Sequence, residues 1–292
     1  MSLRIVTCNV MVMAYELVAG WAERAGHEIV LLVTSPAGTV ERYGASYLAL
    51  VEVVAPRHPV LVTASMKAAA PQIAAARPDL LLSATFPHKL PASVTAIPRL
   101  GAFNMHPTPL PQGRGPNPLR PLYDGAETLG FTLHQTSPVL DGGLIYSRQE
   151  APLPDDLSHE AIFGVWGPLA AKALDEGIAR ALAGEPGLPQ DETRASYGAP
   201  FTEAEHWLDW DTPLALLRKR VAALQAGSRG AFAILEEQPI RILRLIGAPA
   251  ADPLPDVPPG TVTRQTHDTA RVRVQDGLAD VTFAFHEGDP PQ

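Results

Sequence analysis

The sequence predicts an α/β chain in which a mostly parallel sheet, covered by helices, is followed by a smaller β domain. Short continuous apolar runs over 3–8, 28–34 and 80–83 alternate with helical patterns. Such runs are typical of strands buried on both faces of a parallel sheet. Toward the C-terminus the runs become short and alternating, which indicates a separate β domain. A length of 292 residues is enough for one large domain and a smaller one.

Helices are expected between the first strands. The segments 12–25 and 65–77 have helical patterns and are followed by Gly26 and Pro78, residues that stop helices. A third short strand is expected either near 50–54 or at 60–62, and the pattern does not decide between the two. The carboxyl ends of parallel strands form one edge of the sheet, where ligands are expected to bind.

Two further strands are expected to flank a turn that contains Asp141. They cover 130–135 and 144–150, and two glycines follow Asp141 in the turn. Glycine permits backbone angles that other residues avoid, so we expect an unusual turn there. A long helix is predicted over 158–183 because its apolar positions recur at helical spacing and Gly184 follows.

The domain limits follow from a change in pattern. We expect a catalytic domain over 1–185, a linker over 186–205 that is rich in proline and poor in periodicity, and a C-terminal domain over 206–292. Five short alternating runs in the last part predict a small barrel of the OB type. These runs cover 231–235, 240–246, 260–263, 270–274 and 280–285.

Composition excludes several classes of protein. The formal charge is −8 and the pI about 5.6, which argues against a general polyanion binder. The single cysteine, Cys8, cannot form an internal disulfide, so a cytoplasmic location fits. The sequence contains no apolar stretch of eighteen residues, no secretory signal and no Cys/His cluster with metal-ligand spacing. We therefore expect no membrane span and no metal site.

Three polar residues carry the candidate chemistry. Asn104 and His106 stand two positions apart in an extended segment, so both side chains can face one pocket. The carboxamide can donate to a developing oxyanion, the imidazole can carry a proton, and Asp141 can orient the imidazole or accept a proton through water. Together they suit acyl transfer without a protein nucleophile. A structural role for an isolated histidine is the alternative, and it is the role expected of His134.

The residues around this trio resemble the folate-dependent formyltransferase family. The family's signature is Asn-X-His-Pro-Ser-Leu-Leu-Pro, a short loop that ends in Arg-Gly, and later Asp-X-Gly-X-Ile. This chain reads Asn104-Met105-His106-Pro107-Thr108-Pro109-Leu110-Pro111, then Arg114-Gly115, then Asp141-Gly142-Gly143-Leu144-Ile145. The match extends from about residue 78 through 150. The chain departs from the pattern at Thr108, which keeps a hydroxyl, at Pro109 and at Gly113.

The resemblance implies a Rossmann-like catalytic domain followed by an OB-like domain, and transfer of a formyl group from 10-formyltetrahydrofolate to an amine. It implies that Asn104, His106 and Asp141 are the catalytic residues. The residues that the resemblance assigns to the folate pocket are Phe86, Leu90, Val139, Leu140 and Gly143. On the residues alone, a surface loop whose Phe86 caps the core is the favoured interpretation of this segment.

The acceptor is expected to be the primary amine, or hydroxylamine, of a small metabolite such as an amino sugar nucleotide or an amino acid. From residue 205 onward nine Arg/Lys face twelve Asp/Glu, 9 − 12 = −3, and the segment 35–44 lacks a basic insertion, so binding of nucleic acid is not expected. Residues 8–14 lack the glycines of a phosphate loop, which argues against a glycinamide ribonucleotide acceptor.

Other functions remain as alternatives. These are methionyl-tRNA formyltransferase, formyltetrahydrofolate hydrolase, in which water replaces the amine, and a non-catalytic binding module. A nicotinamide oxidoreductase is disfavoured because no Gly-X-Gly-X-X-Gly follows the first strand. The sequence does not fix the oligomeric state.

Overall fold

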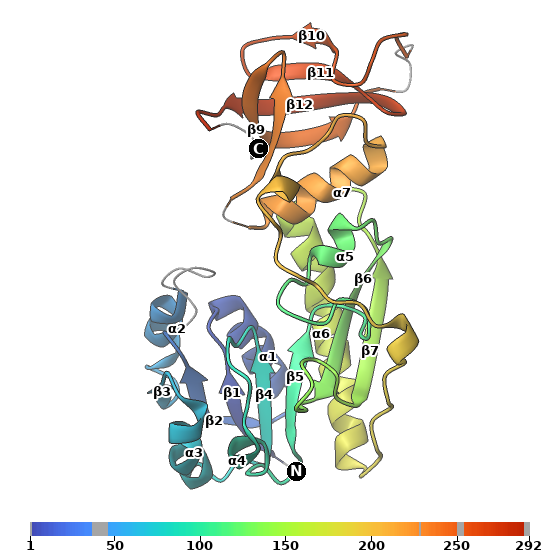
Figure 1. Ribbon diagram of the computed structural model, residues 1–292. Helices are drawn as coiled ribbons and strands as arrows, with labels where there is room; N and C mark the ends of the chain where they lie inside the picture. Colours follow the sequence, from blue (N-terminus) through green and yellow to red (C-terminus); the bar gives the residue numbers. More distant parts are fainter. Residues whose placement is uncertain (1, 37–45, 228, 250–253, 289–292) are drawn as a thin grey trace. The chain divides into compact units, whose positions relative to one another are not determined.

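The computed structural model describes residues 2–36, 46–227, 229–249 and 254–288 (Figure 1). The chain divides into two compact units, each built from several stretches of sequence. The first unit holds 1–115, 130–151 and 165–197, and the second holds 116–129, 152–164 and 198–292. The domain limits expected from the sequence stay a prediction.

A seven-stranded sheet forms the frame of the first unit, with the strand order β3-β2-β1-β4-β5-β6-β7. The first five strands are parallel, and β6 runs antiparallel to β5. The bounds are β1 Arg4–Cys8, β2 Glu28–Thr34, β3 Val60–Val62, β4 Leu80–Ala84, β5 Ala102–His106, β6 Thr128–Gln135 and β7 Ile145–Pro152. The predicted strands are thus present. Of the two positions expected for the third strand, 60–62 is correct and 50–54 is wrong, because 50–54 belongs to a helix.

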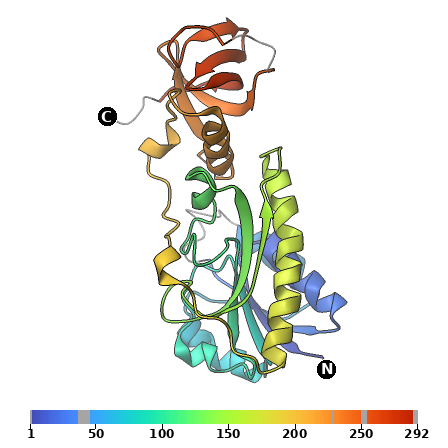
Figure 2. The ribbon, with the colours of Figure 1, turned by 90° about the vertical axis from the view of Figure 1, so that its right-hand side faces the viewer.

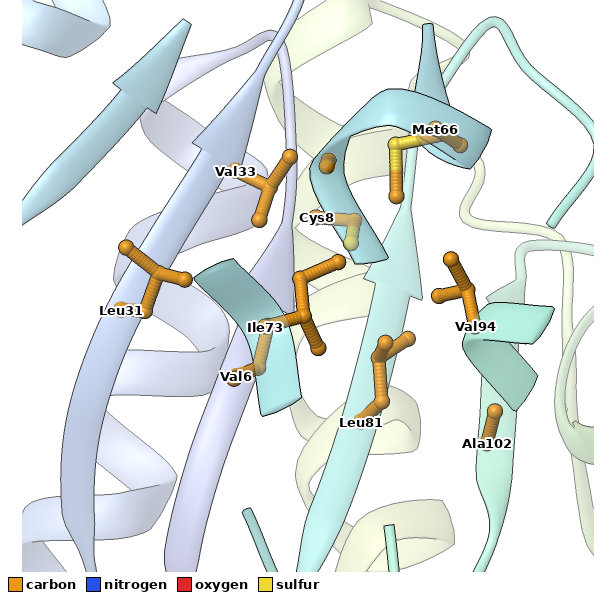
Figure 3. Packing of buried hydrophobic residues seen from close by; sticks show 10 residues of the cluster. Val6, Cys8, Leu31, Val33, Met66, Ile73, Leu81, Val94 and Ala102 are labelled. Carbon is orange, nitrogen blue, oxygen red and sulfur yellow. The ribbon is translucent and has the colours of Figure 1, made fainter. Parts of the chain in front are cut away.

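Helices cover this sheet. They are α1 Val12–Arg24, α2 Ser46–Val54, α3 Met66–Ala75, α4 Ala92–Thr95 and α6 His159–Leu182, the last drawn as one long helix in Figure 2. On one face, Met66 and Ile73 of α3 pack with Val94 of α4 against apolar side chains of the strands, among them Val6 and Leu81 (Figure 3). The predicted helices 12–25, 65–77 and 158–183 are confirmed, with ends that differ by one or two residues.

Close packing joins α6 to the sheet and to α1. Trp21 of α1 donates a hydrogen bond of 2.8 Å from its indole nitrogen to Asp175 of α6. Gly177 of α6 lies against Leu133 of β6, since a Cβ at this glycine would stand 2.6 Å from a methyl group of that leucine. The core therefore holds β6 firmly, and β6 carries part of the candidate site.

The second unit contains a five-stranded antiparallel sheet with the order β10-β11-β12-β9-β8. Its strands are β8 Ala231–Leu235, β9 Gln238–Gly247, β10 Val262–Gln265, β11 Thr269–Val274 and β12 Gly277–Phe285. The same unit holds the helices α5 Arg120–Tyr123 and α7 Leu214–Gln225. Four of the five predicted runs are strands, and the fifth, 260–263, overlaps β10 only from Val262 onward. The expected fold class, a Rossmann-like part followed by a smaller OB-like β part, is confirmed. Among the described helices, none combines the length and the apolar character needed to cross a membrane.

Candidate active site

The site lies where β5 ends and pairs with β6. Asn104 stands opposite His134 in the antiparallel register, and His106 stands opposite Thr132. Because side chains alternate along a strand, Asn104 and His106 lie on the same side of β5, as the sequence predicts. The pairing with β6 adds His134 to this side.

The turn after β5 is fastened to β6 by one hydroxyl group. Thr132 donates from Oγ1 to the carbonyl oxygen of Thr108 at 2.7 Å and accepts from the backbone N–H of Leu110 at 3.1 Å. The peptide bond between Leu110 and Pro111 is cis. The turn then brings the carbonyl oxygen of Gly113 to 2.8 Å from Nε2 of His106. A carbonyl can only accept, so the proton of neutral His106 is on Nε2 and its Nδ1 is free.

Asp141 reaches the same place from the connection between β6 and β7. Asp141 itself has the left-handed backbone, with φ of 51°, and the glycines that follow it do not. The expectation that those glycines supply the unusual angles is therefore wrong. They are needed for space, because a Cβ at Gly143 would overlap the carbonyl oxygen of Gln135 and one at Gly142 would stand 2.7 Å from Val139.

The three predicted catalytic residues converge. Nδ2 of Asn104 lies 3.4 Å from Oδ1 of Asp141, and Nδ1 of His106 lies 3.7 Å from Oδ2. The carboxylate also accepts a hydrogen bond of 2.8 Å from the backbone N–H of Gly115. His106 and Asp141 are buried, whereas Asn104 is half-buried. The carboxylate is too far from His106 for a direct hydrogen bond, so the carbonyl of Gly113 orients that imidazole instead.

His134 is a member of the cluster that the sequence does not identify as such. Its Nδ1 donates to the carbonyl oxygen of Gln135 at 3.0 Å, which leaves Nε2 to accept from Nδ2 of Asn104 at 3.2 Å. The same Nε2 lies 3.6 Å from Asp141. These bonds agree with the structural role expected of His134, and they give it the further effect of orienting the amide of Asn104. The signal that would have found it is the strand register.

Burial and charge set the protonation states. Burial lowers the pKa of His106 below its ordinary value, and the nearby carboxylate of Asp141 opposes this only in part. Burial raises the pKa of Asp141, but contact with His134, the charge of His106 and the N–H of Gly115 together lower it to about 2. At neutral pH the cluster therefore holds an ionised Asp141 beside a neutral His106. Among the described residues, no three His, Cys, Asp or Glu side chains are grouped to hold a metal ion.

The residues expected to contact folate lie in two places. Phe86 and Leu90 follow β4 and pack, half-buried, against the core cluster. Val139 and Leu140 precede Asp141 and are 60% and 40% exposed. Gly143 has the packing role described above, and its carbonyl accepts a hydrogen bond of 2.8 Å from Gln190.

Comparisons with known proteins agree with this arrangement. The model of the family described as "Formyl transferase" matches residues 10–164, and that of "Formyl transferase, C-terminal domain" matches 200–288. The chain is 32% identical over 245 residues to the methionyl-tRNA formyltransferase of Thiobacillus denitrificans. This alignment covers 82% of this chain and 78% of the relative. It is 31% identical over 279 residues to the methionyl-tRNA formyltransferase of Roseiflexus sp., and this alignment covers 91% of this chain and 83% of the relative.

Solved structures share the fold. WlaRD, a sugar 3N-formyl transferase studied with dTDP and 5-N-formyl-THF, aligns with a TM-score of 0.67 at 12% identity, over 99% of this chain and all of that one. HypX from Aquifex aeolicus in complex with tetrahydrofolic acid aligns with a TM-score of 0.67 at 15% identity, over 96% of this chain and 44% of that one. At these identities the likeness concerns the fold alone. The family model and the curated relatives, by contrast, also show the family: this chain belongs to the formyl transferase family.

Proposed function

We propose that this chain transfers the formyl group of 10-formyltetrahydrofolate to an amine. The observation that carries the proposal is the cluster of carboxamide, imidazole and carboxylate at the end of β5, in a chain of the formyl transferase family. The exposed side chains of Val139 and Leu140 beside the cluster suit the flat ring of a folate. The donor is thus a substrate held next to the polar groups that act on its formyl carbon.

Asn104 would stabilise the negative charge that develops on the formyl oxygen. One of its two amide N–H groups is held by His134, which fixes the plane of the amide. The other points to Asp141 at 3.4 Å, a long and weak hydrogen bond that can be exchanged for a developing oxyanion.

His106 would move the proton. Because Nε2 is held by Gly113, only Nδ1 can exchange a proton, and this atom faces Asp141. Neutral Nδ1 takes the proton from the attacking amine as the new C–N bond forms. The resulting imidazolium is stabilised by ionised Asp141 and returns the proton to the folate nitrogen as the old C–N bond breaks. His106 is neutral before the amine attacks, because burial lowers its pKa.

The names of the curated relatives favour methionyl-tRNA as the acceptor. They support this alternative more directly than they support the small amine that the sequence predicts. The segment 35–44, in which the sequence shows no basic insertion, lies mostly outside the described residues. Methionyl-tRNA is therefore one of two acceptors that the proposal carries.

Charge supports the second acceptor, a small amine. The run Arg218-Lys219-Arg220 of α7 is used within its own unit, where it binds protein groups. Arg218 donates to the carbonyl oxygen of Asp155 at 2.7 Å, and Lys219 pairs with Glu127 at 2.5 Å. Arg220 lies over the ring of Tyr123 at 5.1 Å. Cations that are engaged in this way contribute less to a phosphate-binding surface.

The test supplies the purified chain with 10-formyltetrahydrofolate and, in separate reactions, charged initiator tRNA, amino sugar nucleotides, amino acids or no amine. Release of tetrahydrofolate and the mass gain of the acceptor are measured. Formylation of one acceptor class is the expected result and identifies that class. Formate release at the same rate without any amine would replace the proposal by the hydrolase alternative, and no turnover with any acceptor would contradict it.

A further inference from the structure

A segment within the linker expected from the sequence binds both loops of the site. These are the loop after β5, which holds Gly113 and Gly115, and the connection between β6 and β7, which holds Asp141. This segment, residues 188–197, is named the strap here. At one end Leu188 exchanges two backbone hydrogen bonds of 2.8 Å with Ile145, at the start of β7. At the other end Ser196 accepts from the backbone N–H of Arg114 at 3.0 Å, and its hydroxyl accepts from the N–H of Gly113 at 2.9 Å.

Gln190 lies between these ends and uses its whole amide group. Its Nε2 donates to the carbonyl oxygens of Asp141 at 2.7 Å and Gly143 at 2.8 Å. Its Oε1 accepts from Nε of Arg114 at 2.9 Å and from Nη2 at 2.7 Å. Two donors and an acceptor with two lone pairs are all that a glutamine side chain offers. Both donors of Gln190 bind the loop that holds Asp141, and its acceptor binds Arg114 in the loop after β5.

Arg114 completes this connection. Its side chain is 10% exposed and pairs with Glu192 of the strap at 2.7 Å. The arginine of the Arg-Gly sequence is therefore directed to the strap. The residue after it, Gly115, donates its backbone N–H to the carboxylate of Asp141. Gln190 thus contacts Asp141 through its backbone and, by way of Arg114, the loop that binds its carboxylate.

We propose that Gln190 is a positioning residue that holds Asp141 in its reactive orientation. Asp141 has a left-handed backbone that a residue with a side chain adopts only when its surroundings hold it there. The hydrogen bonds from Gln190 to the carbonyl oxygens of Asp141 and Gly143 fix the backbone of residues 141–143. The inference deepens the proposed function and rests on it, because Gln190 acts only through the carboxylate that the reaction uses.

The test compares two substitutions of Gln190. Gln190→Met keeps the length of the side chain and removes all its hydrogen bonds. Gln190→Glu keeps the acceptor for Arg114 but places an oxygen against the carbonyls of Asp141 and Gly143. We expect both to lower kcat by about tenfold to 100-fold, since a displacement of ~1 Å can cost that much. Asp191→Asn is the matched control on the strap, since the Asp191 side chain accepts its hydrogen bonds from Thr193 and contacts neither loop of the site, and it should match the wild type.

A double-mutant cycle separates positioning from a general effect on folding. In the background of Asp141→Asn, Gln190→Met should cost no further kcat, because the carboxylate it positions is gone. Single-turnover reactions with enzyme in excess keep the low rates measurable. A loss of the same size in both backgrounds, or no loss in the wild-type background, would overturn the inference.

The pKa of the His106 ring can be measured without any enzymatic activity, so it tests the role of Gln190 independently of the proposed function. Asp141 raises the pKa of His106, whereas burial and His134 lower it. If Gln190 holds Asp141 in place, the NMR titration of the His106 ring should show a lower pKa in Gln190→Met than in the wild type and no change in Asp191→Asn. An unchanged titration in Gln190→Met would overturn the inference. A wild-type chain that formylates no amine would overturn the proposed function alone.

Discussion

At the scale of single residues, the site depends on a buried carboxylate that stays ionised. Asp141 keeps its charge because the backbone N–H of Gly115 and the amide of Asn104 donate hydrogen bonds to its carboxylate. Substitution by asparagine preserves the size and suits the left-handed backbone, which asparagine adopts more readily than most residues. Asp141→Asn therefore removes the charge and leaves the fold in place.

We expect Asp141→Asn to lower kcat by about 100- to 10,000-fold, the usual cost of removing a positioned acid–base group. Binding of the folate should change little, because the proposed mechanism gives the carboxylate a role in proton transfer and assigns contact with the folate ring to other groups. The measurement is kcat in steady state together with a fluorescence titration with tetrahydrofolate. Full activity in this variant would remove Asp141 from the mechanism.

His106 determines the pH dependence. Burial lowers its pKa, whereas an unfolded histidine titrates near ~6.5. The proposed reaction needs unprotonated Nδ1, so kcat/KM should stay at its plateau as the pH falls through 6.5 and decrease only below it. A pH–rate profile measures this, and an acid limb centred above ~6.5 would contradict the assignment. Because the folded pKa is the lower one, His106 also contributes stability above pH ~6.5 that is lost as the pH falls through the folded pKa.

Substitution of Gly143 tests whether the turn at Asp141 needs glycine for lack of space. A methyl group there would overlap the carbonyl oxygen of Gln135, so Gly143→Ala should lower the free energy of unfolding by about 1–3 kcal/mol, as overpacking usually does. Thermal unfolding measures the effect. Gly164→Ala is the matched control, since a Cβ at that helical glycine meets nothing within 4 Å. Equal melting temperatures for Gly143→Ala and the wild type would show that the turn has room.

At the scale of elements, β6 positions the site as much as β5 does. Thr132 fastens the turn after β5 by accepting from Leu110 and donating to Thr108. Thr132→Val would remove both of these hydrogen bonds and leave the two buried backbone groups only the bond of 3.0 Å from the N–H of Leu110 to the carbonyl of Thr108, at a cost of about 1–3 kcal/mol in stability. We also expect a reduced kcat because the turn orients His106. Thr128→Val, at an exposed position of the same strand, serves as control, and equal stability of the two variants would contradict this role.

The sequence predicts the β5 part of the site and misses the β6 part for a physical reason. Alternation along one strand is enough to place Asn104 and His106 on one side. The position of His134 depends on the register between two strands, which is a long-range property. Gln190 was missed for a similar reason, because a segment without periodicity shows nothing of the backbone carbonyls that its side chains bind. The glycines after Asp141 were predicted to be necessary, but for backbone angle and not for space.

At the scale of the whole molecule, the fold class follows from pattern alone. Continuous apolar runs such as 28–34 mark strands with both faces buried, and the alternating runs of the second unit mark strands with one buried face. The ambiguity between 50–54 and 60–62 has the same origin, since a short apolar run fits a buried strand and a buried helix equally well. The division into units was less accessible, because each unit gathers several separate stretches of the chain.

The central claim is that this fold transfers a formyl group directly from a folate to an amine, with no formyl group bound to the protein on the way. A single turnover with ¹³C-formyl-labelled 10-formyltetrahydrofolate, quenched at successive times and followed by mass spectrometry of acceptor and intact protein, tests it most directly. The label should pass to the acceptor as tetrahydrofolate appears, while the mass of the protein stays constant. A transient protein mass raised by one formyl group, or label found only in formate, would contradict it.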